Sequence, residues 1–352
     1  MVRLIVGRRV LITGLGTFWG SRVAQALEAS PDVEAIVGLD TTEPLVQLVR
    51  TEFVRADQSY SILSRIVSAT RVDTILHMFL VVDSTRMSPR ALHEQNVIGT
   101  MNLLAAASAP GSSVRQVVVK SSTLVYGSST ADPERFTEQT PRATPPRTRL
   151  ERTLVEAEGY VHDFADDNPT IPVALLRFSN VVGTDIETPI TRALQLPLVP
   201  CVFGFDPLLQ FTEEDDVVRS IEFATHAQVG GVYNVAGDGR LPWSEVVDIC
   251  GRRRAPLPAL ATQLAAAPLR RLGVDLPPEL LQLLRYGRGV DTRRLKQAGF
   301  AYRYTSAGAM ENFARSLRLR GSVGSRRPPY HYDAEVERFF RQSPAVIRDL
   351  RS

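Results

Sequence analysis

The stretch that decides the fold is Val10-Leu11-Ile12-Thr13-Gly14-Leu15-Gly16-Thr17-Phe18-Trp19-Gly20, near the start of the chain. An apolar run followed by glycines is typical of a short buried strand that ends in a tight turn. Apolar residues then recur at helical spacing and predict a helix over residues 18–29, which Pro31 ends. The stretch is therefore a strand, a glycine-rich turn and a helix in direct succession.

The same alternation continues through the first half of the chain. Apolar runs predict further buried strands at residues 33–39, 74–79, 114–119 and 172–178, and a long helix is predicted at residues 88–108. Strands that alternate with helices predict a parallel sheet with right-handed crossovers. The predicted fold class is α/β, a doubly wound parallel sheet of the Rossmann type. Later in the chain, residues 185–210 are proline-rich and predicted to be irregular, and residues 251–290 are predicted to form a basic helical stretch.

Composition excludes several classes of protein. The hydrophobic fraction of 44% and the charged fraction of 22% exclude global disorder. A net charge of +3 does not indicate a nucleic-acid-binding surface, and no apolar run approaches the ~18 residues that span a bilayer. Two cysteines and five scattered histidines show no metal-ligand spacing. We expect a cytoplasmic protein with no metal, no membrane span and no nucleic-acid partner.

The glycine-rich turn lies where a pyrophosphate binds at a helix N-terminus. Glycines let the backbone turn sharply and approach the phosphates, and the free amides of the helix attract the negative charge. Asp40 follows Gly20 by twenty residues, at the end of the second predicted strand. A carboxylate there accepts hydrogen bonds from the adenosine ribose and repels a 2′-phosphate. The sequence therefore predicts NAD binding in preference to NADP.

Because 352 residues exceed the roughly 250–300 at which a single core stops growing, a second unit is expected. We predict a dinucleotide-binding domain at residues 1–180, to which the chain returns around residues 210–236. The predicted substrate lobe comprises residues 181–209 and 237–320, and residues 321–352 are predicted to be a linker and tail.

Further motifs carry a resemblance to a known family. They are Asn96-Val97-Ile98-Gly99-Thr100-Met101-Asn102, Ser121-Ser122-Thr123-Leu124-Val125-Tyr126-Gly127 and Leu176-Arg177-Phe178-Ser179-Asn180-Val181-Val182-Gly183. The chain resembles the extended short-chain dehydrogenase/reductases, the NAD-dependent epimerase/dehydratase family. The resemblance implies a smaller substrate lobe and an NAD site. The predicted cofactor-binding residues are Gly14, Gly16, Thr17, Phe18, Trp19, Gly20, Asp40, Asp57, His77, Asn96 and Ser121. For His77, a packing role is favoured over catalysis.

The catalytic residues that the resemblance implies are incomplete. In this family a Ser or Thr, a Tyr and a Lys four residues after the Tyr carry out the proton transfer, and Ser122 corresponds to the first of them. Lysine occurs only at Lys120 and Lys296. The residues four positions before these are Gln116 and Thr292, so the sequence contains no Tyr-x-x-x-Lys.

The missing pair is expected shortly after Pro141. Alignment places Thr148 or Arg149 at the tyrosine position and Arg152 or Thr153 at the lysine position. In the register Thr148/Arg152, the arginine supplies positive charge near the ribose, but an aliphatic hydroxyl is far less acidic than a tyrosine. The candidate catalytic residues are Ser122, Thr148 and Arg152.

Two functions from different classes remain open. One is epimerase- or dehydrogenase-type chemistry on a nucleotide sugar or a bulkier alcohol, with a substitute for the lost base. Tyr160 and His162 are nearby candidates, although a place on the helix surface is favoured for both. The other is a dinucleotide-binding sensor or scaffold without turnover, and RNA binding through the arginine-rich C-terminal half is a third alternative. The resemblance also implies a homodimer, formed through residues 88–108 and about 147–166.

Overall fold

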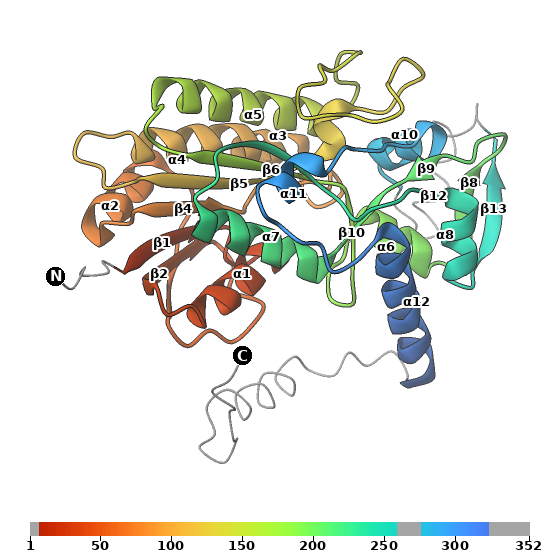
Figure 1. Ribbon diagram of the computed structural model, residues 1–352, viewed down its shortest axis with the longest axis horizontal. Helices are drawn as coiled ribbons and strands as arrows, with labels where there is room; N and C mark the ends of the chain where they lie inside the picture. Colours follow the sequence, from red (N-terminus) through yellow and green to blue (C-terminus); the bar gives the residue numbers. More distant parts are fainter. Residues whose placement is uncertain (1–6, 259–275, 324–352) are drawn as a thin grey trace.

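A seven-stranded parallel sheet forms the centre of the computed structural model, which describes residues 7–258 and 276–323 (Figure 1). The strand order β11-β6-β5-β4-β1-β2-β3 has the first strand inside the sheet, with the chain wound outward from it in both directions. This confirms the predicted doubly wound α/β class. The strands are β1 (Arg8–Thr13), β2 (Val33–Asp40), β3 (Thr51–Arg55), β4 (Thr74–His77), β5 (Gln116–Ser122), β6 (Val173–Phe178) and β11 (Gly231–Val235).

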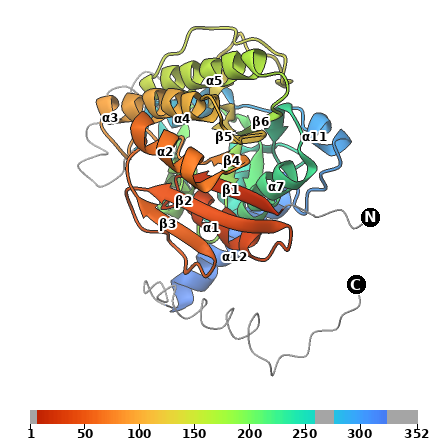
Figure 2. The same ribbon diagram turned by 90° about the vertical axis from the view of Figure 1, so that its left-hand side faces the viewer.

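Helices cover both faces of this sheet (Figure 2). Helices α1 (Phe18–Glu28) and α7 (Glu214–Ala227) pack together on one face. The other face carries α2 (Tyr60–Thr70), α4 (Gly99–Ala107) and α5 (Arg149–Asp167). Successive side chains of a strand point to opposite faces, so Val10 and Ile12 enter the first core and Leu11 enters the second. The unbroken apolar run of β1 is thereby buried on both sides.

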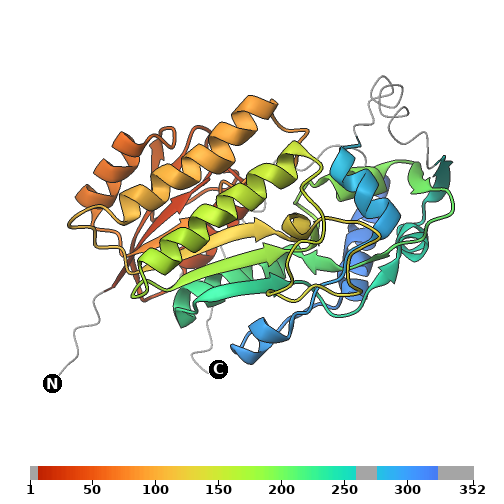
Figure 3. The ribbon, with the colours of Figure 1, turned by 90° about the horizontal axis from the view of Figure 1, so that it is seen from above.

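A smaller lobe lies beyond the carboxyl ends of the strands (Figures 1 and 3). Its own core gathers Phe211, Trp243, Leu284 and Phe313 with other buried apolar residues. The lobe is where α6 (Pro189–Gln195), α8 (Trp243–Ile249), α10 (Pro278–Tyr286) and α12 (Ser306–Val323) lie. Short two-stranded sheets link these helices, and their strands are β7 (Asn180–Val182), β8 (Leu198–Val202), β9 (Leu208–Leu209), β10 (Phe211–Glu213), β12 (Leu241–Pro242) and β13 (Arg253–Leu257).

Strand β5 ends three residues later than predicted. The apolar run ends at Val119, but the polar residues that follow it continue the ladder with β6, up to the pair Ser122 and Phe178. Their side chains are buried. A buried polar group is tolerated when it has a partner, and here Lys120 and Ser121 both form internal hydrogen bonds. The extension carries Ser122 to the very edge of the sheet.

The helix predicted over residues 88–108 is present but is not a regular α-helix throughout. It consists of α3 (Pro89–His93), one π-helical turn η1 (Glu94–Ile98) and α4. The wider turn contains Asn96, which is fully buried and bonds to the backbone of another loop. Single π turns are frequent at functional sites, and apolar periodicity gives no sign of one.

Two predictions for the lobe were too coarse. Residues 253–257 fall in the stretch predicted to be helical, yet they form β13, which pairs in parallel with β8. That pairing also orders part of residues 185–210, which were predicted to be irregular. Helix α12 continues to Val323, past the start of the predicted linker at residue 321. The rest of the predicted tail lies outside the described residues.

Candidate active site

The glycine-rich turn is held by its own side chains. Thr17 is the N-cap of α1, and its Oγ1 accepts a hydrogen bond from the Gly20 amide at 3.1 Å and donates one to the Gly14 carbonyl at 2.7 Å. Gly14 has a φ of 77°, and a Cβ atom there would lie 2.6 Å from the Phe79 nitrogen. Only glycine fits this position. Thr17 therefore stabilises the turn from within.

Asp40 is tied to that turn. Its Oδ2 accepts a hydrogen bond from the Gly16 amide at 3.0 Å, and its Oδ1 accepts one from the Thr42 amide at 3.1 Å. A carboxylate accepts about four hydrogen bonds, and Oδ2 receives only this one from the described residues. Asp40 thus keeps capacity to accept a hydroxyl hydrogen beside the amides at the start of α1.

Asp57 and His77 differ in their exposure. Asp57 is exposed, and its Oδ1 accepts a hydrogen bond from the Ser59 amide at 3.1 Å, next to the start of α2. His77 is fully buried, and its Nε2 lies 2.8 Å from the Thr100 hydroxyl. Burial lowers the pKa of His77 to about 3. His77 is thus neutral, and its ring joins β4 to α4. The packing role favoured from the sequence stays a prediction.

Asn96 and Ser121 also bond within the protein. The Asn96 amide group accepts from the Val81 nitrogen at 2.8 Å and donates to the Val81 oxygen at 2.9 Å, which fixes the loop after β4. Ser121 donates to Glu158 at 2.5 Å. Asn96 therefore positions the loop after β4, and Ser121 connects β5 to helix α5.

Ser122 and Trp19 share one cavity at the carboxyl edge of the sheet, which we call the cleft. Ser122 Oγ accepts a hydrogen bond from the Leu124 amide at 3.2 Å, so its own hydrogen is free to be donated to a bound molecule. The first turn of α1, which follows the glycine-rich turn, and the candidate catalytic serine therefore border the same cavity. The described residues that line the cleft are Trp19, Val82, Lys120, Ser121, Ser122, Thr123, Leu124, Phe178, Ser179, Asn180, Val181, Thr188, Pro189, Ile190, Glu279, Leu280, Leu283 and Arg288.

Helix α5 brings neither Thr148 nor Arg152 into that lining. Thr148 is the N-cap of the helix, and its hydroxyl accepts a hydrogen bond from the Glu151 amide at 3.1 Å. Arg152 is exposed. In the alternative register, Thr153 faces inward, and its hydroxyl accepts a hydrogen bond from Asn96 at 3.3 Å. Among the described residues, α5 thus offers the cleft no proton-transfer group.

The cleft instead contains three charged side chains that the sequence did not single out, and the first is Lys120. Its Nζ donates to the Leu80 carbonyl and lies 4.7 Å from the centre of the Trp19 ring. Burial lowers the pKa of Lys120 to about 7. One signal was available, because Lys120 precedes Ser122 by two residues in a strand and must face the same side.

Arg288 is the second of these charges. It is buried, and its guanidinium donates to the Gly127 carbonyl at 2.7 Å and to the Ser128 hydroxyl at 2.8 Å. Burial lowers the pKa of Arg288 to about 10, so it remains a cation at neutral pH. None of its hydrogen-bond partners among the described residues is a carboxylate.

Glu279 is the third. It is only 4% exposed, and its Oε1 accepts a hydrogen bond from the Ser84 hydroxyl at 2.5 Å. Burial raises the pKa of this carboxyl above its ordinary value. In the sequence, Glu279 follows two prolines at the start of a helix and gives no sign of a place in a site.

A buried polar network holds the base of the cleft. Arg177 donates from Nε to both Glu158 oxygens at 3.1 and 3.0 Å, and from Nη1 to the Tyr126 hydroxyl at 2.8 Å. Tyr126 in turn donates to Asn234 at 2.8 Å. Burial raises the pKa of Tyr126. Tyr126 is therefore a neutral structural group, not a substitute for the missing base.

A larger cavity of about 470 Å³ lies elsewhere, beside residues 290–293. Four of its six charged side chains pair with one another, Lys296 with Asp238 at 2.6 Å and Arg293 with Asp291 at 2.5 Å. None of the predicted site residues lines it. Size alone thus does not mark the active site, and the cleft is the better candidate.

The described residues contain neither a membrane-spanning helix nor a metal-ligand cluster. No helix among them is long and apolar enough to cross a membrane. Within the same residues, no three His, Cys, Asp or Glu side chains gather in an arrangement that could hold a metal ion.

Known proteins match both the sequence and the fold. Residues 10–236 match the sequence model of the NAD dependent epimerase/dehydratase family. The chain belongs to this family. An uncharacterised protein of Mycobacterium tuberculosis (strain ATCC 25618 / H37Rv) is 34% identical over 319 residues, which cover 88% of this chain and 84% of that protein.

Solved structures of epimerases and dehydratases share the fold. A dTDP-glucose 4,6-dehydratase from Bacillus anthracis in complex with NAD superposes with a TM-score of 0.68 at 20% identity, over 91% of this chain and 99% of the other. A UDP-glucose 4-epimerase from Thermotoga maritima with UDP-glucose gives 0.67 at 17% identity, over 90% and 100%. The family assignment made from the motifs is therefore confirmed, and at these identities the structures establish the fold.

Proposed function

We propose that this protein is an NAD-dependent enzyme with oxidoreductase or epimerase-type chemistry on a nucleotide sugar or a bulkier alcohol. The observation that carries the proposal is the shared cavity of Trp19 and Ser122. A molecule bound there would contact Trp19 at the start of α1 as well as the Ser122 hydroxyl, which is a hydrogen-bond donor. The family relationship supports NAD as the cofactor.

The residues present fit this cofactor. The amides at the start of α1 would bind the pyrophosphate, and Asp40 would accept hydrogen bonds from the adenosine ribose. Gly20 fits a tightly packed turn, since a Cβ atom there would lie 2.2 Å from the Gly14 oxygen. When bound, NAD supplies a hydride acceptor or donor at its nicotinamide ring.

The chain's own residues orient the substrate. The free hydrogen of Ser122 would be donated to the reacting oxygen of the substrate. The Arg288 cation would attract an anionic part such as a diphosphate. Leu280 and Leu283 add apolar lining from the stretch that the sequence predicted to be helical, which suits a bulky group. These features are compatible with both substrate classes.

Binding and turnover test the proposal separately. We expect NAD to bind in calorimetry and NADH to quench tryptophan fluorescence. Trp19→Phe should remove the quenching, whereas the matched variant Trp243→Phe should keep it, because Trp243 lies in the lobe core. Turnover is then sought with UDP- and dTDP-sugars, sterols and isoprenoid alcohols. Absence of NAD binding would refute the proposal.

One observation favours a second candidate, an NAD-binding sensor or scaffold without turnover. Thr148 is occupied as a helix cap and Arg152 is exposed, so the positions expected for the dyad carry no acid or base into the cleft. Tight NAD binding with no product from any substrate in the panel would support this alternative.

A further inference from the structure

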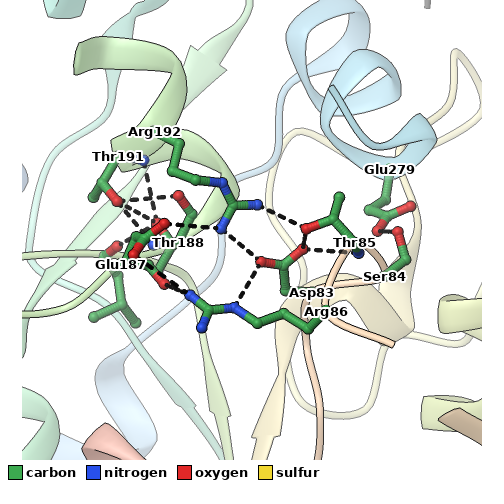
Figure 4. Close-up of polar contacts among 10 residues, drawn as sticks. Asp83, Ser84, Thr85, Arg86, Glu187, Thr188, Thr191, Arg192 and Glu279 are labelled. Carbon is green, nitrogen blue, oxygen red and sulfur yellow. Dashed lines mark hydrogen bonds and ion pairs between the residues drawn. The ribbon is translucent and has the colours of Figure 1, made fainter. Parts of the chain in front are cut away.

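The wall of the cleft opposite the sheet carries a carboxyl group with one free oxygen. Glu279 is in the first turn of α10, and Figure 4 shows its Oε1 joined to Ser84. Its Oε2 is buried and has no hydrogen-bond partner among the described residues. A buried acceptor without a partner is costly, and in a native site it calls for an explanation such as a ligand or a catalytic role.

The loop that carries Ser84 is fixed to the lobe. Arg192 of α6 lies 2.9 Å from Asp83 Oδ2, and its Nη2 donates to the Thr85 hydroxyl at 3.0 Å (Figure 4). Arg86 donates to the same Asp83 oxygen at 3.4 Å. Ser84 is therefore a well-positioned donor, and it holds the Glu279 carboxyl in one orientation at the cleft.

The surroundings of Glu279 favour the protonated form of its carboxyl group. Burial raises its pKa most, and the neighbouring Asp83 carboxylate raises it further, while the hydrogen bond from Ser84 lowers it. The Lys120 and Arg288 side chains line the same cleft. A general acid or base works best when its pKa lies near the working pH.

We propose that Glu279 is the group that exchanges a proton with the reacting oxygen of the substrate, in place of the missing tyrosine. The inference rests on the proposed function and assigns a residue to its proton step. In the forward direction the substrate O–H bond breaks, its electron pair stays on the substrate oxygen, and the proton bonds to Glu279 Oε2. In the reverse direction the same proton returns to a carbonyl oxygen. Ser84 is a positioning residue.

The first test does not depend on activity. Dicyclohexylcarbodiimide converts a protonated carboxyl in an apolar cavity into a stable N-acylurea, which peptide mass spectrometry locates. We expect modification of Glu279, with the yield falling as pH rises. Glu279→Gln should abolish that adduct. An unmodified Glu279 under conditions that label other carboxyls overturns the inference.

Glu213 provides a matched control. It is also buried, and burial raises its pKa to about 7, but both of its oxygens have partners, the Asp215 amide at 2.6 Å and Asn312 at 3.0 Å. It does not line the cleft. Glu213→Gln should therefore leave the labelling of Glu279 and the turnover unchanged. Equal effects of both substitutions on labelling and turnover would overturn the assignment.

The second test measures turnover on a substrate found in the panel. Glu279→Gln should lower kcat by about 10²–10⁴-fold, keep NAD affinity, and remove the acidic limb of the pH profile. Glu279→Asp should restore part of the activity. Unchanged kcat in Glu279→Gln overturns this inference and leaves the proposed function intact. If the proposed function itself is wrong, the wild-type protein binds no NAD. The two failures can therefore be told apart.

Discussion

Replacing Lys120 by methionine is expected to stabilise the fold at neutral pH and to reduce the dependence of its stability on pH. Methionine retains most of the apolar length of the side chain and removes the charge. The wild-type amine is only 2% exposed, and its one acceptor within residues 7–258 and 276–323 is the Leu80 carbonyl. Burial of a charge is unfavourable, which lowers the pKa of Lys120 from its ordinary value of 10.5 to about 7.

The sign and size of the effect follow from the difference between the pKa of Lys120 in the folded chain and in the unfolded chain. Below about pH 7 both states of the chain carry the proton, and the folded state bears the full cost of a buried ammonium. Between about 7 and 10.5 the unfolded chain binds a proton that the folded chain has lost, so stability rises with pH. The slope is roughly 1 kcal/mol per pH unit, and the whole window amounts to at most roughly 5 kcal/mol. Above pH 10.5 the cost disappears.

Urea unfolding at a series of pH values measures this effect. The difference in unfolding free energy between Lys120→Met and wild type should be largest near pH 7 and shrink as the pH rises. The chain's other lysine is the control: Lys296 lies at the surface beside Asp238, so Lys296→Met should keep the wild-type profile. Parallel profiles for Lys120→Met and wild type would refute the reasoning.

Three further predictions concern the cofactor, the core and the assembly. Asp40→Ala should weaken NAD binding in calorimetry and reduce the preference over NADP; a wild-type preference for NADP would contradict the placement of Asp40. Glu158→Ala should lower the free energy of unfolding by roughly 3–5 kcal/mol, because it leaves the Arg177 cation buried and unpaired, and denaturant unfolding measures this. Light scattering at micromolar concentration should give the mass of a homodimer formed through α4 and α5, and a monomer would refute this prediction.

The sheet was predictable because local patterns determine it. The apolar run at Val10–Ile12 must be buried on both faces, and the glycines that follow it permit no other continuation than a tight turn. The same logic located β2, β4 and β6. The same logic placed the end of β5 too early, because Lys120 to Ser122 remain in the strand. Their burial depends on partners far along the chain, such as Leu80 and Glu158, and a pattern of apolar residues does not encode those contacts.

The candidate site likewise has residues that the sequence could predict and residues that it could not. Gly14, Asp40 and Ser122 could be found because each occupies a fixed place relative to a strand end. Glu279 could not, since the residue that orients it, Ser84, lies 195 positions away in the sequence. Arg288 likewise bonds to a loop more than 150 residues distant. Contacts between the lobe and the sheet form the surroundings of both charged side chains. Such long-range contacts cannot be predicted from a single sequence.

The charges in the cleft constrain what it can bind. At neutral pH Arg288 is a cation, and Lys120, with a pKa of about 7, is about half protonated. Burial raises the pKa of Glu279, which favours its protonated and uncharged form. The local potential is therefore positive, although Leu280 and Leu283 make much of the lining apolar. A positive potential in an apolar setting stabilises a negatively charged oxygen more strongly than water does. A substrate that develops an alkoxide beside Ser122, or that carries a phosphate toward Arg288, gains from this arrangement, whereas a neutral and unreactive alcohol gains only from the apolar walls. The cleft thus favours a ligand with one charged and one apolar part.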